Sequence, residues 1–267
     1  MNDVRFPVLL NLGLISRADG VMQQPENRSK FRVLSATFFA ILVSLAIPQQ
    51  SGAQTSTYNK STAVAYAINN YNAHNKNVAP YAPYGTVNLF YDFQLDGQNN
   101  CAHFANQCIL AGLCGTSDRK AVYNARFAFI ADKNSPMSWY YNTKSESSPP
   151  WRGASAMYNY ARGNWPTYKG LHFDFVTEDK VSAYDITKIQ IGDIVFSELE
   201  GSGVTHVMVV SYIETRIQKT DRKYEDRVQL TYQTNDVLNR GIANIRAEKP
   251  KLRIHVYRPV NYTTKGL

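Results

Sequence analysis

The sequence is short of cysteine and of charge for its length of 267 residues. Charged residues make up 19% of the chain, whereas hydrophobic residues make up 44%. This balance excludes a disordered chain, and the composition also excludes a collagen-like repeat and a coiled coil. Three cysteines are too few for a disulfide scaffold, and an odd number leaves at least one free thiol in a monomer.

Several functional motifs are also missing. The sequence has no Gly-rich phosphate loop, no serine-nucleophile elbow and no HExxH motif. His172 and His255 lack acidic or cysteine partners at ligand spacing, so neither a metal nor another cofactor is predicted. The net charge of +8 suits an anionic surface such as a cell wall, but the basic residues form no run typical of nucleic-acid binding. No nucleic-acid partner is therefore expected.

A secretory leader is predicted near the N-terminus. Arg28, Lys30 and Arg32 precede an apolar run over 33–47, and the small residues of Ser51-Gly52-Ala53 follow it. A helix of 15 residues spans only about 22 Å, less than the hydrocarbon core of about 30 Å. We expect cleavage after Ala53 and a secreted, periplasmic or cell-envelope protein without membrane association. The alternative is an uncleaved anchoring helix.

The rest of the chain is expected to form one domain over 54–267, after an N-terminal extension and signal peptide over 1–53. Apolar spacing predicts helices over 61–71, 101–113 and 153–162. Short β-rich runs predict strands over 194–196, 204–213, 228–234 and 252–257. Helices followed by an antiparallel sheet are the pattern of the α+β class.

Cys101 is the candidate nucleophile because it stands at the start of the central predicted helix. A helix N-terminus carries about half a positive charge and unpaired N–H groups, which stabilise a thiolate and can hold an oxyanion. Tyr91 or Gln94, shortly before it, is a further candidate oxyanion donor. The alternative is that Cys101 is simply a small buried residue.

His206 is the candidate general base. It opens an apolar strand after a Gly-Ser-Gly loop, which favours exposure in a cleft over a role as a core histidine. Pairing of 204–216 with 225–236 would place Asn235 opposite His206, about 5 Å away at Cβ, with Gln233 on the same face. Either amide could hold the imidazole in the tautomer that faces a thiol.

The other two cysteines leave one alternative open. Cys108 lies two helical turns after Cys101, about 10 Å away and too far for a disulfide. A Cys108–Cys114 disulfide is possible only if the helix ends near Gly112. Such a bridge would leave Cys101 as the free thiol.

Five segments carry a resemblance to a known family. They are Tyr58-Asn59-Lys60, Asn100-Cys101-Ala102-His103-Phe104, Gly192-Asp193-Ile194-Val195, Thr205-His206-Val207-Met208 and Gln233-Thr234-Asn235-Asp236. Their order resembles the bacterial putative amidase domain, which is distantly similar to CHAP and NlpC-type cysteine peptidases. The resemblance implies a papain-like core over about 58–260, with N-terminal helices packed on the antiparallel sheet. It also implies Cys101 as nucleophile and His206 as general base.

Two positions depart from the family pattern. Asn100 stands where the family has an acidic residue, and Gln233-Thr234 stands where it has His-Thr. We expect a secreted cysteine hydrolase that cleaves amide bonds in peptidoglycan or peptides through a Cys-His-Asn/Gln triad. The alternatives are a transglutaminase-like acyl transferase and an inactive module that binds the cell wall.

Overall fold

The computed structural model describes residues 55–73, 90–91, 98–130, 133, 138–163, 169–179, 185–214 and 227–264. The predicted signal peptide and Gln94 lie outside these residues. Within these ranges, no helix has the length and apolar character needed to cross a membrane.

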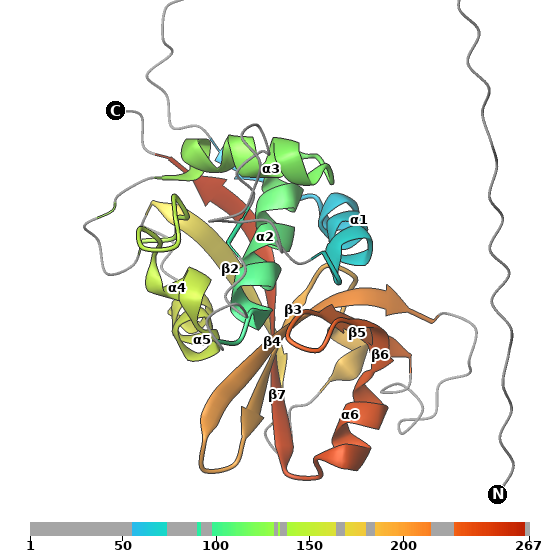
Figure 1. The fold of residues 1–267 in the computed structure, drawn as a ribbon. Coiled ribbons are helices and arrows are strands. Elements are labelled where there is room, and N and C mark those ends of the chain that lie inside the picture. The colour runs from blue at the N-terminus through green and yellow to red at the C-terminus, as the bar shows by residue number, and fades with distance from the viewer. Residues whose placement is uncertain are drawn as a thin grey trace, which may run out of the picture. The chain divides into compact units, whose positions relative to one another are not determined.

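Helices and strands alternate only in part along the chain (Figure 1). The helices are α1 (Lys60–Asn70), α2 (Cys101–Cys114), α3 (Arg119–Ala125), α4 (Pro149–Arg152), α5 (Ala154–Arg162) and α6 (Ile242–Glu248), with 3-10 turns at Arg126–Phe129 and Ile186–Lys188. The strands are β1 (Thr55–Thr57), β2 (Gly170–Glu178), β3 (Ile194–Leu199), β4 (Gly203–Ile213), β5 (Val228–Tyr232), β6 (Val237–Gly241) and β7 (Leu252–Thr263). The predicted α+β class is confirmed.

The strands form one seven-stranded antiparallel sheet. Its order is β1-β7-β3-β4-β5-β6, and β2 also pairs with β7. The long β7 therefore pairs with β3 over 252–257, with β2 over 255–263 and with β1 over 261–263.

The two faces of the sheet bury different helices. Val207 and Val209 of β4 belong to the core cluster that also contains residues of α1, α2, α4 and α5. Met208 and Val210 belong to a second cluster, which contains residues of α6. Successive side chains of a strand point to opposite faces, so the two clusters lie on opposite sides of β4.

Helix α2 is the central helix of the first cluster. Every residue from its first position to Leu113 is buried, as expected for a helix that is apolar on nearly all sides. The helix continues through Cys114 and ends at Gly115, whose φ of 70° closes it. The Cys108–Cys114 disulfide that the sequence left open does not form: all three thiols are free, and a rise of six residues along the helix separates these two by about 9 Å.

His103 lies in an aromatic cluster beside α2. Its ring centroid is 4.9 Å from that of Tyr141, 5.4 Å from that of Trp151 and 5.8 Å from that of Phe90. The side chain is 1% exposed, and burial lowers its pKa to about 3. It is therefore a neutral packing residue at physiological pH.

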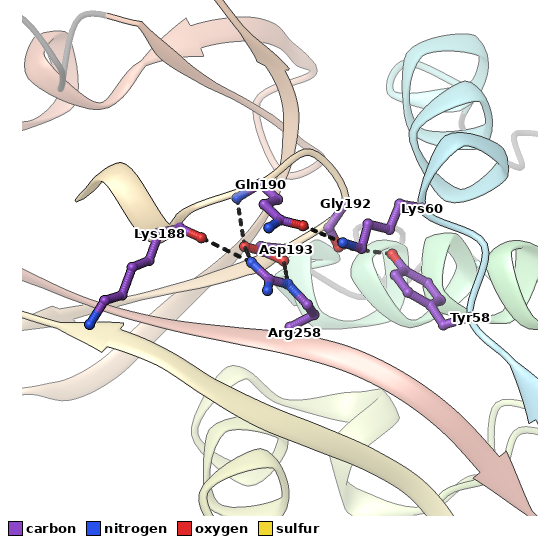
Figure 2. A network of polar contacts seen from close by, with 7 residues as sticks. All are labelled: Tyr58, Lys60, Lys188, Gln190, Gly192, Asp193 and Arg258. Carbon is purple, nitrogen blue, oxygen red and sulfur yellow. Dashed lines mark hydrogen bonds and ion pairs between the residues drawn. The ribbon is translucent and has the colours of Figure 1, made fainter. Parts of the chain in front are cut away.

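A buried ion pair fastens β7 to the turn that precedes β3 (Figure 2). Asp193 is fully buried and accepts from Arg258 through Nε at 2.8 Å and Nη2 at 2.9 Å. The backbone N–H of Gln190 donates to the same carboxylate at 2.8 Å, and Arg258 also donates to the carbonyl of Lys188 at 3.0 Å. Burial raises the pKa of Asp193, while the bonds from Arg258 oppose that shift.

The same turn also contacts the start of α1. The Tyr58 hydroxyl donates to the Gly192 carbonyl at 2.8 Å, and Lys60 donates to the side chain of Gln190 (Figure 2). Gly192 has a φ of 82°, and a Cβ there would lie 2.9 Å from Cβ of Lys60. Only glycine fits this turn without strain, so the Gly-Asp pair places α1, β3 and β7 together.

Breaking the buried ion pair should lower the free energy of unfolding much more than breaking an exposed ion pair does. Arg258→Met leaves the Asp193 charge buried and unpaired, so we expect the free energy of unfolding to fall by about 3–5 kcal/mol. The control is Lys251→Met, which breaks the exposed Lys251–Glu200 pair of 3.2 Å and should cost less than about 1 kcal/mol. Urea unfolding of both variants measures this, and equal losses would contradict the role given to Arg258.

Acid should destabilise the protein partly through His103. Its pKa of about 3 in the folded state lies below the unfolded value of about 6.5, so the unfolded chain binds a proton that the folded chain does not. This contribution is complete above pH 6.5 and is lost as the pH falls, by about 2–3 kcal/mol at pH 4.5. Between pH 7 and 4.5, His103→Leu should lose that much less stability than the wild type in urea unfolding. An identical loss of unfolding free energy in both proteins would refute the conclusion that the pKa of His103 is lowered in the folded state.

Candidate active site around Cys101

Cys101 is the first residue of α2 and lies at the wall of a cavity. The residue is 2% exposed, and the cavity has a volume of about 360 Å³. The described residues that line it with Cys101 are Gln98, Asn99, Arg152, Gly153, Ala154 and Thr205. The sulfur can therefore be reached by a small polar group that enters this cavity.

Three backbone N–H groups act on the sulfur. They belong to Cys101, Ala102 and Val207, and each lowers the pKa of the thiol. The first two belong to the first turn of α2, where N–H groups have no helical partner. Asn100 makes no side-chain cap that would occupy them.

Burial nevertheless raises the pKa of Cys101, and this effect is larger than that of the N–H groups. The expectation of a stabilised thiolate, based on the helix N-terminus, is therefore wrong. The helix is buried at this end, and removal of water penalises the charged form more than three hydrogen bonds favour it. The thiol is neutral at pH 7 and needs a base to remove its proton.

His206 directly precedes Val207, whose N–H acts on the sulfur of Cys101. Its ring packs edge-on against Tyr232 with a centroid distance of 4.7 Å, and Nε2 is buried without a hydrogen-bond partner. By strand alternation the imidazole points to the face of Met208, away from α2. Among the hydrogen bonds of the described residues, none joins Cys101 and His206. Burial, and secondly the charge of Lys249, lower the pKa of His206 to about 4.

The predicted pairing of Asn235 with His206 is wrong. A β-bulge shifts the β4–β5 register by one residue, so that Val209 lies opposite Thr231. Strand β5 then ends at Tyr232, and Asn235 is exposed in the turn over 233–236. The sequence contains the two strands and their turn but no signal for the bulge.

Gln233 is buried, and its side-chain amide bonds to groups other than the His206 imidazole. Its Oε1 accepts from Asn100 Nδ2 at 2.5 Å, and its Nε2 donates to the Asn70 carbonyl at 2.9 Å. It thus ties the residue before the nucleophile to the end of α1. The structure does not bring Gln233 to His206, contrary to the predicted triad.

Thr234 is a residue that the sequence analysis did not select. Its φ of 106° is unusual for a β-branched residue and costs about 1–3 kcal/mol. Its hydroxyl is buried without a partner of standard geometry, yet lies near enough to the Cys101 thiol to lower its pKa. The strained turn after β5 therefore places a hydroxyl group at the sulfur.

A second cavity, of about 520 Å³, lies around His255. Its Nε2 is 2.8 Å from Oε2 of Glu198, and its Nδ1 is 3.3 Å from Oε2 of Glu178. These carboxylates do not stand at ligand spacing from His255 in the sequence, because β2 and β3 bring them from distant parts of the chain. In the described part of the chain, no group of three or more His, Cys, Asp or Glu side chains could hold a metal ion.

The other residues missed by sequence reasoning are Arg152 and Thr205. Arg152 lies in α4, whose first two residues are Pro149 and Pro150, a pattern that marks the first turn of a helix. Thr205 directly precedes His206, and the β-bulge beside it turns it toward the cavity of Cys101. Neither placement follows from local sequence.

Removing the Thr234 hydroxyl should slow the reaction of Cys101 with iodoacetamide. Thr234→Val keeps the side-chain shape but removes the hydroxyl that lowers the pKa of the thiol, so the rate constant at pH 8 should fall about three- to tenfold. Thr234→Ser restores a hydroxyl and should react like the wild type. Mass spectrometry of the Cys101 peptide measures the rate, and an unchanged rate in the valine variant would exclude this contact.

Comparison with known proteins yields one finding. The model of the family described as putative amidase domain matches residues 57–257. No curated protein and no solved structure matches the chain.

Proposed function

The chain belongs to the putative amidase domain family, and from this we propose that it hydrolyses amide bonds with Cys101 as nucleophile and His206 as general base. The observation that carries the proposal is the N–H of Val207 at the Cys101 sulfur. Since Val207 directly follows His206, the strand that bears the imidazole passes beside the thiol. The description of the family as a putative amidase domain supports an amide as the bond that is cleaved.

In the proposed reaction His206 takes the proton of Cys101 while the sulfur attacks the carbonyl carbon. The N–H of Cys101 and the side-chain amides of Gln98 and Asn99 face the same cavity and can donate to the oxyanion. The C–N bond then breaks, and His206 returns the proton to the amine that leaves. Water, deprotonated by His206, hydrolyses the thioester, and the acid and the thiol are released.

The imidazole has to leave the Tyr232 ring to reach the sulfur. Strand β5 ends at Tyr232, so beyond this point β4 lacks β5 as a neighbour on that side. We propose that rotation of the His206 side chain past this strand end assembles a Cys-His dyad. Burial raises the pKa of the thiol and lowers that of the imidazole, so both groups start neutral rather than as an ion pair.

We extend the proposal to architecture and location. A helix-borne cysteine followed by a strand-borne histidine is the arrangement of papain-like hydrolases, and we propose that core here. The leader pattern over residues 28–53 supports export. Residues 54–267 contain 24 basic and 18 acidic residues, and their net charge of +6 supports an anionic substrate such as peptidoglycan or its peptides.

The test is the release of amino groups from purified peptidoglycan and from its stem peptides. We expect Cys101→Ser to lower kcat/KM at least about a thousandfold, and His206→Asn about a hundredfold or more, with the fold retained. Cys114→Ser should retain activity, because this thiol is partly exposed whereas those of Cys101 and Cys108 are buried. Activity of Cys101→Ser equal to wild type on every substrate it cleaves would refute the proposal.

The pH dependence tests the neutral pair separately. Because kcat/KM reports the free enzyme, it should rise through about pH 4 as His206 loses its proton and then stay level through neutrality. Alkylation of Cys101 without substrate should instead keep rising above pH 8, because burial raises the pKa of the thiol. Alkylation that is already maximal at pH 6 would indicate a thiolate–imidazolium pair.

Two other outcomes identify the alternative functions. Transfer of the acyl group to an added primary amine, in place of release of the acid, identifies an acyl transferase. Equal binding of wall fragments by wild type and Cys101→Ala, with no product from either, identifies a binding module.

A further inference from the structure

Arg152 stands out among the described residues that line the cavity of Cys101. It is the one that carries a charge, and the others contribute amides, a hydroxyl, a thiol and small side chains. No Asp or Glu is among them. Among the described lining residues, Arg152 is therefore the source of charge beside the proposed nucleophile.

The backbone of Arg152 is fixed relative to Cys101. Asn106 of α2 donates to the Pro150 carbonyl at 2.8 Å, and its Oδ1 accepts from the Trp139 indole at 2.5 Å. Trp151 is 1% exposed and packs between the rings beside α2. Helix α4 is thus fastened to α2, so Arg152 and Cys101 are positioned by one rigid unit.

The guanidinium of Arg152 is exposed and makes no hydrogen bond or ion pair with any described residue. Three other arginines do form ion pairs, in Arg258–Asp193, Arg246–Asp179 and Arg240–Glu248. An unpaired guanidinium at a cavity wall is suited to bind a carboxylate with two parallel hydrogen bonds.

We propose that Arg152 binds a carboxylate of the substrate close to the scissile amide. The proposal rests on the proposed function and narrows its substrate class to peptides with a free carboxylate beside the bond that is cut. A C-terminal residue provides such a group, and so does an acidic residue that is linked through its side-chain carboxyl and keeps its α-carboxylate free. A cavity of about 360 Å³ holds roughly a dozen water-sized groups, which is enough for one residue and its carboxylate.

Two alkylating reagents test this without knowledge of the natural substrate. Iodoacetate and iodoacetamide both form an S–CH₂ bond with the thiolate and release iodide, but only iodoacetate carries a carboxylate. The measured quantity is the ratio of their rate constants at Cys101 at pH 8.5, divided by the same ratio for free cysteine. The thiolate fraction cancels in this ratio, so a shift in the pKa of Cys101 does not affect it.

We expect the wild-type ratio to exceed that of Arg152→Gln about three- to tenfold at low salt, and Arg152→Lys to retain part of the preference. The matched control is Arg162→Gln, which removes the exposed arginine that ends α5 and should leave the ratio unchanged. Equal ratios for wild type and Arg152→Gln would overturn the proposal, as would an equal fall in Arg162→Gln.

A peptide pair then separates this proposal from the proposed function. With substrates that end in a carboxylate or a carboxamide, Arg152→Gln should lose the preference for the carboxylate, whereas Cys101→Ser should lose both activities. If hydrolysis requires Cys101 but proceeds equally fast with the carboxylate and the carboxamide substrate, the role proposed for Arg152 is contradicted and the proposed function is not. Native Cys101 that reacts with neither reagent would contradict both proposals.

Discussion

The buried pair between Asp193 and Arg258 is the interaction on which the arrangement of the site depends. It joins β7 to the turn that leads into β3, and the same turn holds Tyr58 at the start of α1. Strand β3 sets the position of β4, and β4 carries Val207 to the sulfur of Cys101. A charged pair is suited to this role because an alternative register would leave two charges buried without partners.

The chemistry of Cys101 follows from a competition between burial and hydrogen bonding. Three N–H groups and the Thr234 hydroxyl favour the thiolate, while the dry surroundings favour the thiol. Burial has the opposite effect on His206 and keeps it neutral. Both groups are therefore uncharged at neutral pH, and under the proposed function this suits proton transfer during the attack rather than a preformed ion pair.

Much of the scaffold could be predicted because it depends on local patterns. The apolar spacing around Ala105 and Leu113 predicted α2, and the β-rich runs predicted β3, β4, β5 and β7. Short elements such as α4 and β6 were missed because a few residues carry too little periodicity. The third member of the predicted triad was misplaced by one bulge, which shifts Asn235 away from His206 although both strands were predicted correctly.

The sequence by itself determined the α+β class, the family and the cysteine at the head of the central helix, because these depend on composition, periodicity and residue order. Only the tertiary structure decided that burial raises the pKa of Cys101 more than the helix N-terminus lowers it. It also decided that Thr234 lies near the sulfur, that Arg152 lines the same cavity, and that Gln233 accepts a hydrogen bond from Asn100 before α2. Those placements depend on strand register and on packing between segments far apart in the chain, which local sequence does not encode.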